Sequence, residues 1–118
     1  MYSELLLDHF RNPRNVGKLA NASAEVTATN PICGDILELG IRVNDGEIAE
    51  ARFLCRGCTT SIACASLLTE RLTGCSLTVA RSITAETVSQ SLGGLPPATF
   101  HGAQLAQDAL SILLAKLS

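Results

Sequence analysis

The cysteine best placed for chemistry in this sequence is Cys58. It follows Arg56-Gly57, where a strand pattern ends and a helical pattern begins. At the start of a helix, unpaired backbone N–H groups and the positive end of the helix dipole favour a thiolate. Cys58 is therefore suited either to bind a metal ion or to act as a nucleophile.

Three further side chains complete a plausible ligand set. Cys33 and Asp35 lie in a turn-forming stretch, and His101 lies between the Pro96-Pro97 break and the last helical pattern. Thiolate, imidazole and carboxylate groups are the ordinary protein ligands of zinc and iron. We predict a metal site formed by Cys33, Asp35, Cys58 and His101. Considered one at a time, Asp35 could equally be an ordinary carboxylate in a turn, and His101 an ordinary surface histidine.

The other three cysteines have patterns that favour structural roles. Cys55 shares a strand face with Phe53, and Cys64 lies at the edge of an apolar helical stripe, so burial is expected for both. The Cys55-x-x-Cys58 spacing matches a zinc knuckle, but the chain has no second such pair. Cys75 has no ligand-type neighbour and is interpreted as incidental.

Composition limits the classes of partner. The chain has 118 residues, 3% aromatic residues, a formal charge of −2 and no run of Lys or Arg, which argues against nucleic acid and membrane surfaces. Glu4, Asp8 and His9 interrupt any apolar leader, and no apolar run reaches about 18 residues. We expect a single domain spanning residues 1–118 and a cytoplasmic location, where an odd number of cysteines suits ligands or core thiols.

Hydrophobic periodicity predicts the elements that position these residues. A helix is expected over residues 3–11 and a loop over 12–23, followed by strands over 24–29 and 37–43. In the second strand, Glu38, Gly40 and Arg42 are predicted to face outward. Asn44-Asp45-Gly46 predicts a hairpin into a third strand.

The third strand is predicted to carry Ala49, Ala51, Phe53 and Cys55 on one face. Helices are expected over 59–73, ended by Gly74, over 82–91, and from about Leu105 onward. Consecutive strands joined by hairpins predict an α+β fold: a three-stranded antiparallel meander with helices packed on one face, an N-terminal helix and a long C-terminal helix.

Many motifs, in one order along the chain, resemble the U-type iron–sulfur cluster assembly scaffolds, the family of IscU, SufU and the NifU N-terminal domain. The similarity covers almost the whole sequence. The motifs are Ser3 to Gly17, Cys33-Gly34-Asp35, Val43 to Gly46, Ala51 to Phe53, Arg56 to Cys58, Ser61 to Ala63, Ser66 to Glu70, Leu95 to Pro97, His101 and Leu105 to Ala109.

This resemblance implies a non-enzymatic scaffold or carrier that binds iron or a labile [2Fe-2S] cluster. A cysteine desulfurase would deliver the sulfur, and acceptor apoproteins would receive the cluster. Residue by residue, the resemblance implies that Cys33 and Cys58 are cluster ligands, Asp35 the nearby carboxylate and His101 the histidine before the last helix.

The chain departs from the family pattern at two places. Gly102 stands where the family normally has a third cysteine, and Ala98-Thr99 replaces the end of a motif that a chaperone reads in some members. Two alternatives therefore stay open: a diverged relative that binds zinc or no metal and acts as a sulfur acceptor or desulfurase partner, and a protein in which Cys58 is a nucleophile assisted by His101. A stand-in role for Cys64 would require remodelling of its helix.

Overall fold

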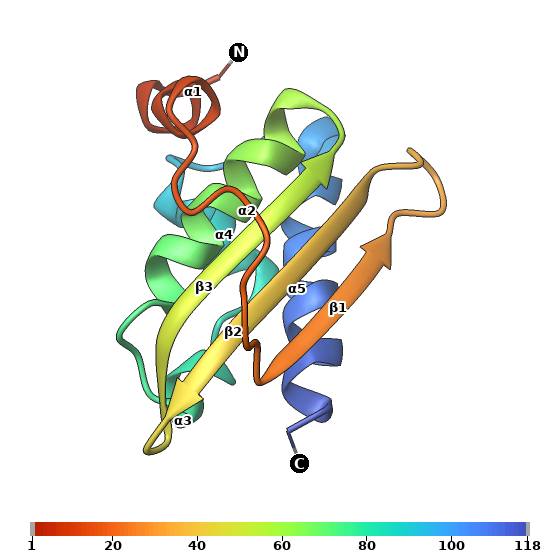
Figure 1. Ribbon diagram of the computed structural model, residues 1–118. Helices are drawn as coiled ribbons and strands as arrows, with labels where there is room; N and C mark the ends of the chain where they lie inside the picture. Colours follow the sequence, from red (N-terminus) through yellow and green to blue (C-terminus); the bar gives the residue numbers. More distant parts are fainter. Residues whose placement is uncertain (1, 118) are drawn as a thin grey trace.

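The computed structural model describes residues 2–117 and has the predicted α+β architecture (Figure 1). A three-stranded antiparallel sheet in the order β1-β2-β3 is combined with helices, which confirms the predicted fold class. The elements are α1 (Glu4–Arg11), β1 (Ala24–Thr29), β2 (Ile36–Asn44), β3 (Glu47–Arg56), α2 (Thr59–Leu72), α3 (Leu77–Ala80), α4 (Ala85–Ser91), the 3₁₀ turn η1 (Pro97–Thr99) and α5 (His101–Ala115).

The sheet register follows from the alternation of apolar and polar residues. In β1 the buried residues alternate strictly with exposed ones, and Val26 lies opposite Leu39, which in turn lies opposite Phe53. The β2–β3 hairpin turns at Asp45-Gly46, where both residues have positive φ angles, 52° and 76°. That conformation explains why the Asp-Gly pair predicts this turn.

One residue in β3 contradicts the predicted face. The register shifts between Arg42 and Val43, so that Arg42 pairs with Glu50 and Val43 with Ile48, which leaves Ala49 as an extra residue. A bulge of this kind reverses the alternation on one side of it. Ile48 is therefore fully buried and Ala49 is exposed, whereas Ala51 and Phe53 face the core as predicted.

Helices α2 and α5 cover one face of the sheet, as Figure 1 shows, with α2 against β3 and α5 against β1 and β2. The predicted inner stripe of α2 is buried along its length, from Ser61 through Ala65 and Leu68 to Leu72. Gly74 follows α2 with φ +88°. A glycine tolerates this left-handed conformation at a helix end, as predicted.

The loop over residues 12–23 crosses the opposite face of the sheet and buries Gly40, which was expected to face solvent. A Cβ at Gly40 would lie 3.6 Å from both Leu19 Cβ and Glu25 Cγ. Gly40 does lie on the outer face of the sheet as predicted, but it is not exposed to solvent. The alternation of apolar and polar residues cannot show which positions a distant loop covers.

Short segments also pair with the outer edge of β3. The Gly17 N–H donates to the Phe53 carbonyl at 2.8 Å, and the Phe53 N–H donates to the Asn15 carbonyl at 3.0 Å. Towards the other end, Ile48 exchanges hydrogen bonds with Gly74 and Cys75 at 2.7 and 2.8 Å. These contacts fix the ends of α1 and α2 relative to the sheet.

Helix α1 packs against α2 through a buried polar contact rather than through a full apolar stripe. Leu6 and His9 are buried, whereas Leu5 and Phe10 are exposed, so only part of the predicted apolar face is covered. His9 Nδ1 lies 2.8 Å from Ser66 Oγ, and the same hydroxyl oxygen accepts the Arg14 N–H at 2.9 Å. The N-terminal helix is thus attached to the centre of α2.

The helix predicted over 82–91 is present as α4 but begins later, at Ala85, and the short helix α3, which was not predicted, precedes it. Thr84 caps α4 by accepting the Thr87 N–H, and Ser76 caps the short α3 by accepting the Val79 N–H. Both threonine and serine are preferred at N-caps, so each marks a helix start. Within residues 2–117, no helix combines the length and apolarity that a membrane crossing requires.

Candidate metal centre

Three chain segments converge at one end of the sheet. Asp35 immediately precedes β2, Cys58 lies between β3 and α2, and His101 is the first residue of α5. In Figure 1 this is the end at which the β3 arrow points into α2. The antiparallel order brings the start of β2 and the end of β3 together, and the packing of α5 on α2 adds the histidine.

The potential ligand atoms of Asp35, Cys58 and His101 all lie within 4.8 Å of one another. Cys58 Sγ is 3.6 Å from His101 Nε2, and His101 Nε2 is 3.9 Å from Asp35 Oδ2. Asp35 is buried, while Cys58 and His101 are partly exposed. One sulfur, one nitrogen and one oxygen atom therefore surround a common point that solvent can reach.

Asp35 is held by hydrogen bonds from the first turn of α2. Ser61 Oγ donates to Asp35 Oδ2 at 2.6 Å, and the Cys58 N–H donates to the same oxygen at 3.4 Å. Burial acts to raise the pKa of Asp35, but these hydrogen bonds and the nearby His101 outweigh it, so the pKa lies below its ordinary value. The carboxylate is ionised and ready to bind a cation near neutral pH.

Gly57 makes this approach possible. A Cβ built at Gly57 would lie 2.8 Å from Asp35 Cγ and 3.0 Å from Asp35 Oδ2, both closer than non-bonded atoms tolerate. Gly57 is not among the residues with a positive φ. It is therefore required for space beside the carboxylate rather than for its backbone conformation.

Cys33, the fourth predicted ligand, lies outside the close group but beside it. The loop that carries it is closed by Asn30, whose side-chain oxygen accepts the N–H groups of Ile32 and Cys33 at 2.9 and 3.2 Å. Cys33 is exposed, and it lines a shallow hollow together with His101 and Phe100. The structure thus brings three of the four predicted residues together and places the fourth on the rim.

Of the remaining cysteines, Cys64 is buried as expected, whereas Cys55 is only half-buried and Cys75 is half-buried in the loop after α2. Burial, with the charges of Asp35 and Cys58, raises the pKa of Cys55 to about 11, and burial raises the pKa of Cys64 to about 12. Burial also raises the pKa of Cys75. These three thiols are protonated near neutral pH. Because the thiolate is the form that attacks or binds a metal, they are less suited to either role.

Gly102, next to His101, is packed against the backbone of α2. A Cβ at this position would lie 2.9 Å from Thr60 Cγ2 and 3.1 Å from both Ser61 N and Thr60 C. Thr60 is fully buried, and its hydroxyl has no hydrogen-bond partner among the described residues. The start of α5 therefore sits closer to α2 than a side chain at this position would allow.

The donor set fits a cation that accepts mixed ligands. Thiolate, imidazole and carboxylate together suit a tetrahedral zinc ion, and mixed ligation is also compatible with an iron–sulfur centre. Cys33, which lines a surface hollow together with His101, offers a second sulfur on the neighbouring loop.

Two residues of this centre were not predicted from the sequence as part of it. Ser61 was assigned only to the inner stripe of α2, and Gly57 only to a turn. A polar residue three positions after a helix N-cap, on an otherwise apolar stripe, is the signal that distinguishes Ser61. No comparable local signal identifies Gly57, because its neighbour Asp35 is 22 positions away in the chain.

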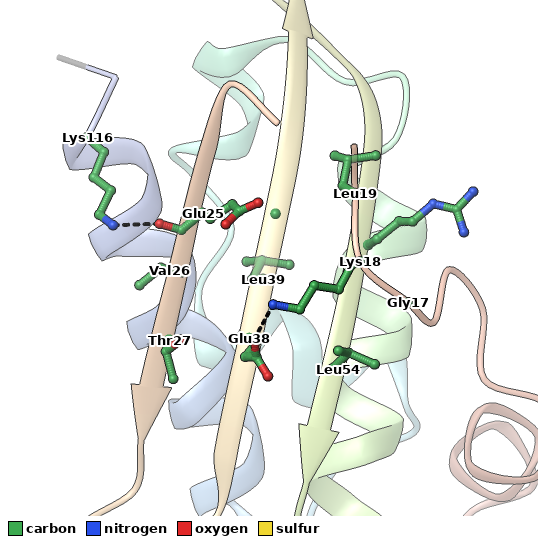
Figure 2. A pocket seen from close by; sticks show the side chains of 12 residues that line it. Gly17, Lys18, Leu19, Glu25, Val26, Thr27, Glu38, Leu39, Leu54 and Lys116 are labelled. Atoms are coloured by element: carbon green, nitrogen blue, oxygen red, sulfur yellow. Dashed lines mark hydrogen bonds and ion pairs between the residues drawn. The ribbon is translucent and has the colours of Figure 1, made fainter. Parts of the chain in front are cut away.

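A separate pocket lies on the outer face of the sheet, beneath the segment from Gly17 to Leu19 (Figure 2). Both of its lysines are engaged: Lys18 Nζ lies 3.3 Å from Glu38 Oε1, and Lys116 Nζ donates to the Glu25 backbone carbonyl at 2.6 Å. Its lining residues include neither cysteine nor histidine. The candidate ligands Asp35, Cys58 and His101 lie outside this pocket, at the end of the sheet.

Comparisons with known proteins agree with one another. Residues 1–117 match the family model described as the NifU-like N terminal domain. The chain is 44% identical over 110 residues to the iron-sulfur cluster assembly scaffold protein IscU 1 of Archaeoglobus fulgidus, covering 93% of this chain and 72% of that protein. It is 42% identical over 118 residues to the scaffold protein IscU of Escherichia coli K12, covering 97% and 91%.

A solved structure shares the fold. The protein FiSufU of Fervidobacterium islandicum AW-1, described as a candidate iron-sulfur cluster assembly scaffold for the SUF system, superposes with a TM-score of 0.79. The superposition covers 96% of each chain at 23% sequence identity. At that identity the similarity concerns the arrangement of the elements.

Proposed function

This chain belongs to the family of NifU-like N-terminal domains, and from that membership we propose that it is an iron–sulfur cluster assembly scaffold that binds iron or a labile [2Fe-2S] cluster. Relatives at 42–44% identity are named as such scaffolds, which supports a scaffold role. The observation that carries the proposal to specific residues is the group formed by Asp35, Cys58 and His101.

Each member of the proposed ligand set has a separate task. Cys58 and Cys33 supply sulfur ligands to iron, His101 supplies nitrogen, and Asp35 supplies an ionised oxygen. Ligation by only two thiolates holds a cluster less firmly than ligation by four, because carboxylate oxygen is a harder and weaker ligand for iron–sulfur centres. A weakly held cluster suits a protein whose product is passed on.

The proposed partners follow from the same chemistry. A cysteine desulfurase supplies sulfur, and acceptor apoproteins take the finished cluster. Cys58 is partly exposed and Cys33 is exposed, which supports direct access of both partners to the thiols. The protein itself needs no catalytic residue in this role, since it binds and releases its cargo.

Anaerobic reconstitution tests this proposal. The protein is incubated with ferrous iron, cysteine, a cysteine desulfurase and a thiol reductant that converts the delivered persulfide sulfur to sulfide. It is then repurified for visible absorption and for iron and sulfide analysis. We expect roughly equal iron and sulfide in wild type, and loss of both in Cys58→Ala. Cys75→Ala is the matched control, because Cys75 is half-buried at the far end of α2, and it should retain the cluster.

A second function is favoured by one observation. The close group contains one sulfur, one nitrogen and one oxygen. Gly102 occupies the position at which the family resemblance would lead one to expect a third cysteine. This set suits a single zinc ion, so the alternative is a zinc-binding sulfur acceptor or desulfurase partner. Tightly held zinc with no sulfide after reconstitution would decide for this alternative.

A further inference from the structure

Ser61 shares its hydroxyl between two of the proposed ligands. Its Oγ donates to Asp35 Oδ2 at 2.6 Å and lies 3.5 Å from Cys58 Sγ. Ser61 is 3% exposed, so water does not compete freely for these contacts. A hydroxyl has one proton, and here that proton is directed to the carboxylate.

This arrangement is not the usual one for a serine in a helix. Serine hydroxyls inside helices commonly bond to a carbonyl of the preceding turn of the same helix, but Ser61 is the third residue of α2 and has no such turn before it. Ser61 instead reaches Asp35, 26 positions earlier in the chain, across the gap between α2 and the start of β2. At the C-terminal end of α2, Thr73 Oγ1 shows the local alternative, since it donates to the Thr69 carbonyl at 2.9 Å.

We propose that Ser61 is a positioning residue of the metal centre, whose hydroxyl fixes the Asp35 carboxylate beside Cys58 and His101. The inference rests on the proposed function, since it assumes that these three residues bind the cation. Without the donor, the buried carboxylate loses its shortest hydrogen bond and can rotate away from the shared point. Loss of such ligand-orienting contacts typically lowers metal affinity by about 10–100-fold.

Two variants of nearly the same shape isolate the hydroxyl. Ser61→Thr keeps the donor and adds a methyl group, whereas Ser61→Val has the same branched shape without the donor. Anaerobic titration of the full chain with Co²⁺ gives the affinity, and the visible d–d and thiolate charge-transfer bands report the ligand geometry. We expect the valine variant to bind Co²⁺ about 10–100-fold more weakly than the threonine variant and with altered bands.

Ser66→Ala is the matched control for a buried serine on α2. Ser66 bonds to His9 and to the Arg14 backbone rather than to the ligands, so its loss should lower the melting temperature and leave Co²⁺ binding unchanged. Equal Co²⁺ affinity and equal spectra of the threonine and valine variants would overturn the positioning role and leave the proposed function intact. Failure of wild type to bind Co²⁺ would overturn the metal centre itself, and with it this inference.

Discussion

At Gly57 a single hydrogen atom in place of a methyl group decides whether Asp35 can approach the centre. Gly57→Ala would place a Cβ 2.8 Å from Asp35 Cγ, so we expect the carboxylate to be displaced and the Co²⁺ affinity to fall by about tenfold or more. Titration of the variant with Co²⁺ measures this change.

Gly40→Ala is the control for the introduced methyl group. Gly40, like Gly57, has no positive φ, but its Cβ would meet its neighbours at an ordinary 3.6 Å. We expect wild-type affinity in Gly40→Ala. A Gly57→Ala variant that also binds Co²⁺ like wild type would show that Asp35 does not need its present position.

At Gly102 the obstacle is α2. Gly102→Cys would bring a Cβ to 2.9 Å from Thr60 Cγ2 and 3.1 Å from the Ser61 backbone nitrogen. Overpacking of this kind typically costs about 1–3 kcal/mol, so the free energy of unfolding should fall by that amount in urea titrations.

The same cysteine should be tolerated better when the Thr60 methyl is absent. In a Thr60→Ser background the closest contact disappears while the hydroxyl remains, so the cost of Gly102→Cys should be smaller. A double-mutant cycle gives this coupling directly. An equal cost in both backgrounds would place the conflict at the backbone contacts alone.

Among the elements, α1 depends on a buried histidine. Burial is the main cause that lowers the pKa of His9, and the Arg14 guanidinium lowers it further. The carboxylates of Glu70 and Asp8 partly oppose this shift. Because the folded pKa lies below the unfolded value near 6.5, the neutral form is the one that folding favours. Stability is therefore fully present above that value and is lost as the pH falls below it.

Urea unfolding between about pH 7.5 and 5.5, above the range in which carboxylates titrate, measures this loss. We expect wild type to lose more stability over this interval than His9→Gln, which keeps a hydrogen-bonding side chain without titrating. The two proteins differ only at position 9, so the comparison isolates the contribution of His9. Parallel pH profiles would show that His9 does not couple α1 docking to protonation.

The elements themselves could be predicted well where local pattern and structure share a cause. Gly74 marks a helix end and Asp45-Gly46 a turn through their own backbone preferences, and β1 has the predicted bounds. The bulge at Ala49 and the packing of the 12–23 loop on Gly40 could not be predicted, because both arise from pairing or packing with distant residues. The periodicity of hydrophobic residues in the sequence does not reveal such contacts.

The candidate centre was predictable to a similar degree. Cys58 stands out because it begins a helix, and His101 because it follows a Pro-Pro break; both lie in the close group with Asp35. The part played by Ser61 and Gly57 was not visible, since it depends on how the start of β2 meets the start of α2 in space. The ligating role of all four predicted residues stays a prediction until a metal is bound.

For the molecule as a whole, a cation at this centre would tie together the start of β2, the start of α2 and the start of α5. Binding only to the folded state stabilises it by about 2.7 kcal/mol when the free ion is at 100 times its dissociation constant. For a domain of this size, that corresponds to an increase of about 10 °C in melting temperature.

Thermal unfolding with and without saturating Zn²⁺ measures this effect. The increase should disappear in Cys58→Ala and persist in Cys75→Ala. An equal increase in both variants would indicate zinc bound elsewhere on the chain.

The pairing along the outer edge of β3 has a consequence for how the protein behaves at high concentration. An open strand edge is a template for another chain, and through it β-proteins aggregate. Here Phe53 is already bonded to Asn15 and Gly17, and Ile48 to Gly74 and Cys75, so an incoming strand would have to displace native partners at both ends. At the opposite edge of the sheet, the Lys116 ammonium occupies the Glu25 carbonyl, and a charged side chain there discourages strand addition. A small sheet with only three strands is thereby protected against self-association through its backbone.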